Sequence, residues 1–563
     1  MLKLNYFLAD IFILSAEKQP IKLSWRKIEW LLQDEWFYYG ILFCLSFLIG
    51  SIKLFSKVWY NIALFVVLML LEVVICNLLG VVYLYPIILA FVVFILFILK
   101  DLKPSNSRNR INDNAICLPV ISGVSGRELK FYYYYANFLV YGGAGSGKTK
   151  SIGKWLLQEY IRLGFAGFIY DFKDIDYTRT AYNLMKKYDY KGEFYYINFD
   201  NLSRSYRFNP LKNVSDKTVL MQLMEDMLLS MQAKDAKQDE WFAGGLGILR
   251  GVAYRLYDEY REYCTIPHIL TLIMNSSQDS LTRFLEQNTI SEMMAGAFLK
   301  AKGSEKTQAS YISTLSNQIA TMATDEKIAW VLSGNDFDFN LIDPEHPKMF
   351  AVSNNFSKNS VYSPVIAMLL SISSRQFTMQ NKVPFVYFLD EMTTVKIKNF
   401  ETLPSVLREY KAAFVLLTQS GAKLENLYGK LDRSSVEANF GNMFLGRTKD
   451  VEALKYYPLF FGKEEKERRS RSAGKSGSSS NSSVTISSQK EDVYQGKDFS
   501  ELEPGEFIGS ATRANVKEFK AKFKMFEMEE EELPVHEFVT PEQVTENYDR
   551  IIQEVQAILN GDI

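Results

Sequence analysis

Long apolar blocks separated by short polar loops mark the N-terminal part of the chain. The first block, Trp36 to Phe55, can cross a bilayer once, because about 20 residues span the hydrocarbon core. The second block, Ile62 to Leu99, is too long for one span, and we interpret it as a helical hairpin that turns near Gly80. Residues 36–100 are therefore predicted to form a transmembrane helical anchor of two or three helices. The segment before it, residues 1–35, has an amphipathic pattern typical of a helix on the membrane surface.

Basic residues beside the spans predict the orientation of this anchor. Four cations follow the last span, namely Lys100, Lys103, Arg108 and Arg110. Short loops rich in lysine and arginine stay in the cytoplasm, so the rest of the chain is expected there. Three spans would place the N-terminus outside and two spans would place it inside, and the sequence leaves both arrangements open.

The pattern changes near Asn137, where short apolar runs flank an amphipathic stretch. Asn137 to Tyr141 has the composition of a buried strand and runs into a glycine-rich loop. Thr149 to Leu163 shows the apolar spacing of a helix, and Phe168 to Tyr170 is a second strand that ends on Asp171. This order predicts a β-α-β unit with the glycine-rich loop at the carboxyl end of its first strand.

The glycine-rich loop matches the GxxxxGK[ST] motif of P-loop nucleotide-binding proteins. Its glycines allow successive backbone N–H groups to surround phosphate oxygens, and the following helix adds its partial positive charge. Lys148 is expected to reach the β and γ phosphates of ATP, and the Thr149 hydroxyl is expected to ligate Mg²⁺. The predicted nucleotide-binding residues are Gly142, Gly143, Ala144, Gly145, Ser146, Gly147, Lys148, Thr149 and Lys150.

Two further apolar runs end in polar residues that suit the same chemistry. Phe385 to Leu389 is followed by Asp390, expected to hold Mg²⁺, and by Glu391, expected to polarise the attacking water. Ala413 to Leu417 leads to Gln419, our candidate for the residue that senses the γ phosphate. The alternative for Gln419 is an amide that only ends the strand.

The remaining patterns divide the chain into predicted segments. From about Ser215 to Trp330 the apolar spacing is helical and strand-like alternation is absent, which predicts an all-α domain inserted in the α/β domain. The predicted boundaries are 101–214 and 336–515 for the two parts of the RecA-like nucleotide-binding domain, and 215–335 for the inserted domain.

Two C-terminal stretches have biased composition. Residues 468–489 are rich in serine and glycine, and we expect a flexible loop there. The alternative is an arm that contacts phosphates through Arg468, Arg469, Arg471 and Lys475. Residues 516–563 form a C-terminal acidic tail with the run Glu529 to Glu532; such runs are usually solvated, although basic partners can dock on them.

Composition limits the remaining possibilities. The net charge of −1 shows that the chain is not basic throughout, so any DNA-binding surface must be local. The 4 cysteines include no CxxC pair and only 3 histidines are present, which argues against a disulfide framework and a structural zinc site.

Several ordered blocks between Phe138 and Gly509 extend beyond the generic P-loop motifs. They are GGAGSGKT, YDFKD with Thr180-Ala181, Asn209-Pro210-Leu211, Trp241, LDE, LTQS with Leu427-Tyr428-Gly429, and Leu502 with Pro504-Gly505-Glu506. With these blocks the sequence resembles the TraG/TraD family of type IV coupling proteins. It departs from the family in YDFKD, which lacks the usual proline and glycine, and in an anchor with almost no external loop.

The resemblance implies a homo-hexamer in the bacterial inner membrane with its ATPase domains in the cytoplasm. Such a ring hydrolyses ATP to move single-stranded DNA, with its attached relaxase, toward the channel of a type IV secretion or conjugation system. In the resembling family, an arginine spaced like Arg408 before the sensor strand end acts as a catalytic finger on the neighbouring subunit's γ phosphate. The alternative for Arg408 is an ordinary surface arginine, and Arg447 is the reserve candidate.

Other functions share parts of this pattern. An FtsK/HerA-like DNA translocase would have the same nucleotide motifs, but the helical insert and the LTQS region favour a coupling protein. A half-transporter of the ABC type is disfavoured because no LSGGQ-like signature precedes Asp390. A membrane docking receptor for protein substrates, with incidental ATPase activity, remains an alternative of a different class.

Overall fold

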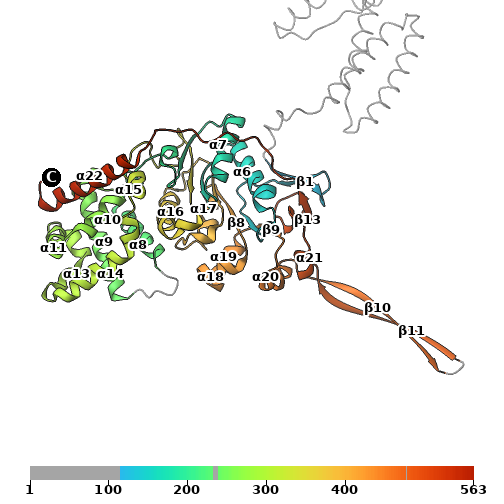
Figure 1. The fold of residues 1–563 in the computed structure, drawn as a ribbon. Coiled ribbons are helices and arrows are strands. Elements are labelled where there is room, and N and C mark those ends of the chain that lie inside the picture. The colour runs from blue at the N-terminus through green and yellow to red at the C-terminus, as the bar shows by residue number, and fades with distance from the viewer. Residues whose placement is uncertain (1–114, 233–238, 477–478) are drawn as a thin grey trace, which may run out of the picture. The chain divides into compact units, whose positions relative to one another are not determined.

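The computed structural model describes residues 115–232, 239–476 and 479–563 (Figure 1). The predicted surface segment 1–35 and the predicted anchor 36–100 lie outside the described residues. Within the described ranges, no helix combines the length and apolar character that a membrane span requires.

An 11-stranded sheet forms the centre of the described chain, in the order β2-β1-β13-β12-β9-β3-β8-β7-β4-β6-β5. The strands from β9 to β5 are parallel to one another, and β12, β13, β1 and β2 extend the sheet with antiparallel pairs. The prediction of an α/β fold around a large parallel sheet is confirmed. The strand bounds are β1 Ile116–Ser122, β2 Glu128–Phe131, β3 Phe138–Tyr141, β4 Ala166–Asp171, β5 Glu193–Ile197, β6 Lys348–Ser353, β7 Phe385–Leu389, β8 Ala412–Thr418, β9 Asn442–Gly446, β12 Glu506–Ser510 and β13 Glu518–Phe523.

Two apolar cores cover the two faces of this sheet. Side chains alternate along β3, so that Phe138 and Val140 enter the core beneath α6 (Lys154–Arg162) and α7 (Asp176–Tyr188). Leu139 and Tyr141 enter the opposite core. Because both faces are covered, the parallel strands need apolar residues at successive positions, which explains their unbroken apolar runs. The helices on the second face are α16 Asn359–Ser374, α17 Leu403–Glu409, α18 Gly421–Tyr428, α19 Lys430–Ala438, α20 Val451–Tyr456 and α21 Gly496–Ser500.

The described chain between β5 and β6 contains helices and no strand. Polar side chains accept backbone N–H groups at the start of six of them, at Asp216, Asp239, Thr265, Ser277, Asn288 and Asp325. This capping satisfies donors that a helix start leaves free. The helices are α8 Lys217–Ser230, α9 Glu240–Glu259, α10 Ile266–Asn275, α11 Gln278–Glu286, α12 Thr289–Met294, α13 Gly296–Lys300, α14 Glu305–Ala323 and α15 Glu326–Leu332.

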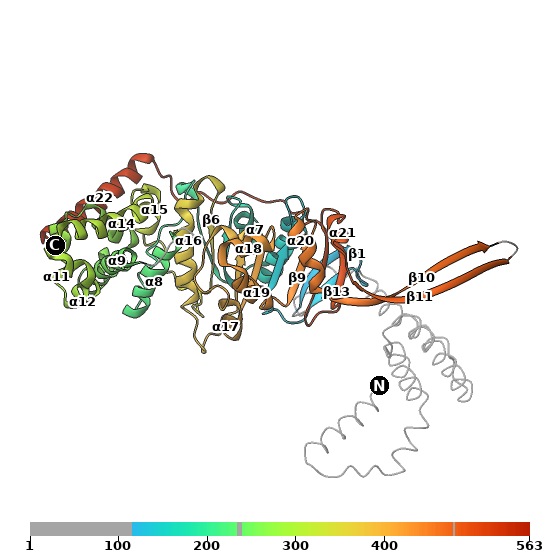
Figure 2. The same cartoon turned by 90° about the horizontal axis from the view of Figure 1, so that it is seen from below.

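The serine-rich segment forms a two-stranded ribbon, so the expectation of a flexible loop at residues 468–489 is wrong. β10 (Lys463–Ser476) and β11 (Ser479–Asp492) pair antiparallel from their outer ends to the turn (Figures 1 and 2). The loop was expected because a segment rich in serine and glycine has few apolar side chains to bury. Backbone pairing requires only an extended partner strand, and the β-branched run from Val484 to Ile486 favours extended backbone.

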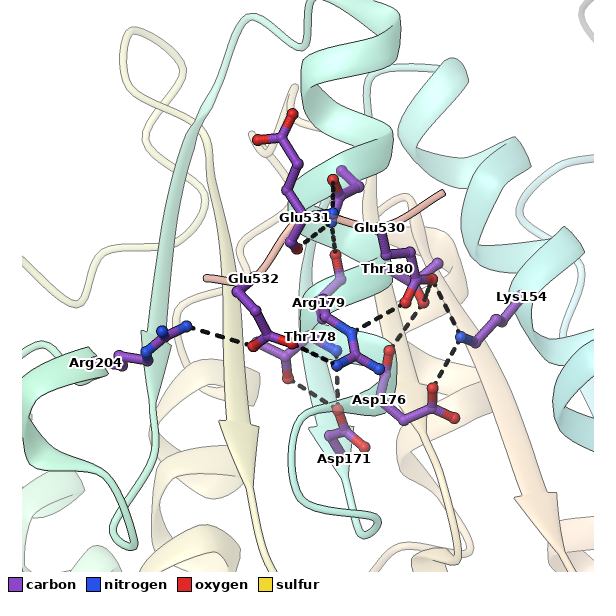
Figure 3. Close-up of polar contacts among 11 residues, drawn as sticks. Lys154, Asp171, Asp176, Thr178, Arg179, Thr180, Arg204, Glu530, Glu531 and Glu532 are labelled. Atoms are coloured by element: carbon purple, nitrogen blue, oxygen red, sulfur yellow. Dashed lines mark hydrogen bonds and ion pairs between the residues drawn. The ribbon is translucent and has the colours of Figure 1, made fainter. Parts of the chain in front are cut away.

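The C-terminal residues 516–563 are also part of the fold, while the side chains of Glu531 and Glu532 stay largely exposed. β13 belongs to the large sheet, and α22 (Pro541–Asn560) packs against α10 and α15. Residues 524–540, which we call the C-terminal strap, connect the two and cross α6 and α7. Figure 3 shows Glu530, Glu531 and Glu532 of the strap among cations of the same chain.

Ion pairs explain why the acidic run is docked. Glu530 accepts from Lys154 at 3.2 Å and Arg179 at 3.1 Å, and it also accepts from Thr180. Arg179 also donates to Glu532 at 3.0 Å. Of the two alternatives left open for the acidic run, docking on basic groups applies to Glu530, whose cation partners lie on α6 and α7, far away in the sequence.

Candidate active site

The glycine-rich loop joins β3 to the helical segment η2 (Lys148–Gly153) at the carboxyl edge of the sheet. Gly145 and Gly147 have φ of 73° and 92°, a left-handed conformation that glycine adopts without steric cost. A side chain at Gly147 would also collide with Gly505, since its Cβ would lie 2.7 Å from the Gly505 nitrogen. The Gly505 N–H donates to the Ser146 carbonyl at 2.8 Å, which fixes the loop against the start of β12.

The helix after the loop begins with a π-turn. The Lys154 N–H donates to the carbonyl of Thr149, five residues earlier. Gly153 makes room on the inner side of this turn, because a Cβ there would lie 2.2 Å from the hydroxyl oxygen of Tyr177. π-turns are rare and occur often at functional sites, and this one bears the predicted phosphate and metal ligands.

Lys148 lies buried between the loop and the end of β7. Its ammonium donates to the Gly142 carbonyl at 2.5 Å and to the Glu391 carboxylate at 3.4 Å. Burial lowers the pKa of Lys148, while the charges of Glu391 and Asp390 oppose that shift. The loop therefore presents a cation, held by a backbone carbonyl and by Glu391, at the place where phosphate is expected.

The acidic pair after β7 is arranged asymmetrically. Both carboxylate oxygens of Asp390 are buried and without a hydrogen-bond partner among the described residues, and burial raises the pKa of Asp390 to about 7. Glu391 has a left-handed φ of 43°, stabilised by Thr394, whose N–H and hydroxyl both donate to the Glu391 carbonyl. Gln419, at the end of β8, donates to the Glu391 carboxylate at 3.4 Å.

These groups fit Mg²⁺ bound together with a nucleotide. A buried carboxylate with free oxygens and the Thr149 hydroxyl are hard oxygen ligands of the kind Mg²⁺ prefers. No group of three or more His, Cys, Asp or Glu residues in the described part of the chain could hold a metal ion alone. Mg²⁺ usually keeps several waters and binds through one or two protein ligands plus phosphate oxygens, which matches this sparse set.

The structure brings most of the predicted residues together and separates one. Lys148, Glu391 and Gln419 are joined by hydrogen bonds at the carboxyl edge. Arg408 is exposed on α17, which precedes the amino end of β8, and lines a cavity of about 580 Å³ shared with Arg513. The reserve candidate Arg447 follows β9, and its backbone carbonyl accepts from the Gly143 N–H at 2.9 Å.

Two residues of the YDFKD block have roles that the sequence did not reveal. Asp171 accepts from the N–H and the hydroxyl of Thr178, at 2.8 and 2.9 Å, and so fixes the first turn of α7. The Lys173 ammonium donates to the Thr149 hydroxyl at 3.2 Å. The only sequence signal for Lys173 is its position two residues after Asp171, where the strand ends.

Comparison with known proteins supports a common fold. A family model described as the type IV secretion-system coupling protein DNA-binding domain matches residues 128–495, well over half of the chain. The unbound bacterial conjugative coupling protein TrwBdeltaN70 has 14% sequence identity and a TM-score of 0.57, covering 72% of this chain and 88% of that chain. No curated protein sequence matches this chain.

Two other solved structures carry nucleotides. The plasmid coupling protein TrwB with the non-hydrolysable ATP analogue ADPNP has 15% identity and a TM-score of 0.57, covering 72% of this chain and 88% of that chain. TrwB with ADP and Mg²⁺ has 14% identity and a TM-score of 0.53, covering 72% of this chain and 87% of that chain. At these identities the likeness establishes the fold, and the chemistry must be argued from the residues.

Proposed function

We propose that this chain, which belongs to the family of type IV secretion-system coupling proteins, is an ATPase that moves single-stranded DNA with its attached relaxase toward a type IV secretion channel. The observation that carries the ATPase proposal is the cluster of Lys148, Glu391 and Gln419 beside the metal-ligand pair of Thr149 and Asp390. TrwB, which shares the fold, was solved with ADPNP and with ADP and Mg²⁺.

The residues of the site have distinct parts in this reaction. Backbone N–H groups of residues 142–150 bind the phosphates, and Lys148 exchanges its present acceptors for β and γ oxygens. Release of Lys148 leaves Glu391 free to orient the attacking water and accept its proton, while Gln419 still donates to Oε1, the oxygen that Lys148 contacted. Thr149 and Asp390 would hold Mg²⁺, which would neutralise charge that develops on the phosphate oxygens.

The assembly we propose is a homo-hexamer at the bacterial inner membrane, anchored by residues 36–100. A ring explains how a chain with net charge −1 can handle DNA, because six copies of a local basic surface would face one channel. It also gives Arg408 a partner site on the neighbouring subunit. The DNA-binding description of the matching family supports DNA as the cargo.

The decisive experiment measures ATP turnover of the full chain in detergent with single-stranded DNA, with duplex DNA and without DNA. We expect turnover that single-stranded DNA stimulates most, and a Lys148→Ala variant that remains at background throughout. Turnover that no DNA stimulates would favour the docking receptor for protein substrates. Equal stimulation by duplex DNA would favour a translocase of the FtsK/HerA type.

A further inference from the structure

Lys173 occupies a defined place beside the predicted metal ligands. It lies in the short loop between β4 and α7, and its ammonium is 3.2 Å from the Thr149 hydroxyl oxygen. Backbone hydrogen bonds hold this loop: the Lys173 N–H donates to Asp171, and the Asp174 N–H donates to the Asn354 carbonyl. The loop geometry therefore directs the lysine toward the P-loop helix.

The two lysines at this edge have different partners. Lys148 is engaged by Gly142 and Glu391, whereas Lys173 donates to the Thr149 hydroxyl. Both carboxylate oxygens of Asp390, the second predicted metal ligand, are buried without a hydrogen-bond partner among the described residues. Lys173 is therefore the cation that a hydrogen bond places on a predicted metal ligand.

We propose that Lys173 substitutes for Mg²⁺ in the nucleotide-free site and binds the γ phosphate once the metal-nucleotide complex has entered. A metal at about 2.1 Å from the Thr149 hydroxyl and an ammonium at 3.2 Å from the same oxygen compete for one place and repel each other. The flexible stem of lysine lets the ammonium leave without movement of the loop. The γ phosphate is the anion that arrives with the metal at this edge. This inference rests on the proposed ATPase function.

Binding in the absence of metal tests the proposal, because there Lys173 and Lys148 must neutralise the end of the triphosphate without Mg²⁺. The full chain in detergent is titrated with ADPNP in EDTA and in excess Mg²⁺, for the unmodified protein and for Lys173→Met. In EDTA, we expect Lys173→Met to weaken ADPNP binding about tenfold, the loss of one charge-assisted hydrogen bond. In Mg²⁺, where the metal supplies the charge, the loss should be no more than about threefold.

Control variants separate this role from simpler ones. Lys173→Arg keeps the cation and should bind ADPNP in EDTA within about twofold of the unmodified protein. Lys187→Met, which removes an exposed lysine from α7, should change nothing. Lys173→Gln provides a second neutral variant if the methionine variant does not fold. In EDTA, Lys173→Met should weaken the binding of ADP much less than the binding of ADPNP, because ADP lacks the γ phosphate.

Equal losses for Lys173→Met in EDTA and in Mg²⁺, or no loss in either, would overturn the substitution of lysine for metal. An equal loss for ADP and ADPNP would overturn the contact with the γ phosphate. Failure of the ATPase proposal looks different, since the unmodified protein would then bind no ADPNP even with Mg²⁺.

Discussion

The two edges of the parallel sheet carry opposite kinds of polar site. At the carboxyl edge, Lys148 and Gln419 both donate to Glu391, and all three residues are buried or half-buried around the P-loop. At the amino edge, Arg408 and Arg513 are exposed, line one cavity and form no ion pair among the described residues. The first edge is a nearly complete phosphate site, whereas the second offers two arginines that pair with no acid in the described part of the chain, even though Glu409 lines the same cavity.

Distance decides what Arg408 can do. Asn137, which directly precedes β3, lines the same cavity as Arg408, whereas Gly142 directly follows that strand. A strand the length of β3 spans about 13 Å, more than an arginine side chain can cross. Arg408 therefore cannot reach the phosphates bound by its own chain. A finger role requires that a second copy place its carboxyl edge against this amino edge, as in a ring.

The reserve candidate Arg447 lies on the other side of this division. A Cβ on Gly145 would be 3.8 Å from a guanidinium nitrogen of Arg447, so this side chain lies over the P-loop of its own chain. The two arginines thus represent two different arrangements, one within a subunit and one between subunits. Their sequence positions, Arg408 before the sensor strand and Arg447 after a later strand, do not distinguish these arrangements. The fold does.

Removal of the central cation of the carboxyl edge should have the largest effect. Lys148→Ala removes the ammonium that shields the charge developing on the γ phosphate, and turnover should fall at least about 100-fold. The measurement is steady-state phosphate release by the full chain, with Lys187→Met as the control for a lost lysine. Near-normal turnover would show that the carboxyl edge is not the catalytic site.

Loss of the candidate base should separate binding from chemistry. Glu391→Gln keeps the shape of the side chain but cannot accept a proton, so hydrolysis should fall about 100-fold or more while ATP still binds. The ATP retained by the variant after rapid gel filtration measures this trapping. If binding and hydrolysis fall together, Glu391 supports the loop, and its left-handed backbone and contact with Lys148 are structural.

Mixing two variants in one ring tests whether Arg408 acts between subunits and Arg447 within one subunit. Arg408→Ala should lower turnover about 100-fold with nucleotide affinity nearly unchanged, because the arginine acts on the γ phosphate of another subunit. Arg447→Ala should instead weaken nucleotide binding, since this arginine lies beside the P-loop of its own chain. Rings mixed from Arg408→Ala and Glu391→Gln subunits should regain activity wherever an intact base meets an intact arginine.

The mixture needs its own controls. Assembly of mixed rings is verified by pulling down one tagged variant with the other. Rings mixed from Arg447→Ala and Glu391→Gln subunits are not expected to recover in the same way, because a base and an arginine acting in one subunit cannot be redistributed between defects. Verified mixed rings of Arg408→Ala and Glu391→Gln that stay inactive would rule out action between subunits.

Local motifs explain what could be predicted of this site and what could not. The phosphate loop and the acidic pair each follow directly from one strand, so Lys148 and Asp390 were predictable from a few neighbouring residues. Contacts between distant segments were not: Lys173 meets Thr149 only because β4 and β3 end at the same edge. The docking of Glu530 on Lys154 likewise depends on the path of the strap across α6.

The same limit applied to the fold. The unbroken apolar runs predicted the parallel strands, since covered faces demand them. The ribbon of β10 and β11 carries no such signal, because its stability comes from backbone pairing between two polar strands. The cavity at the amino edge joins α17 to a turn after β12, and no periodicity in either segment indicates that Arg408 and Arg513 share it.

The smallest effect is expected at Arg513, the second arginine of the amino edge. Arg513 lies over the ring of Tyr133, at 4.7 Å from its centroid, and lines the cavity opposite no acid with which it pairs. If a neighbouring subunit's phosphates approach this edge, Arg513 adds a second positive charge without touching the reacting atoms.

Arg513→Gln keeps much of the side-chain length, so the contact with Tyr133 is largely preserved and the thermal unfolding midpoint should not move. Turnover should fall roughly threefold, because an exposed charge contributes on the order of 0.5–1 kcal/mol. The loss should diminish as ionic strength rises, since salt screens exposed charges. A loss that salt does not change, or one that accompanies a lower unfolding midpoint, would assign Arg513 to the packing of Tyr133 and leave Arg408 as the sole candidate of this edge.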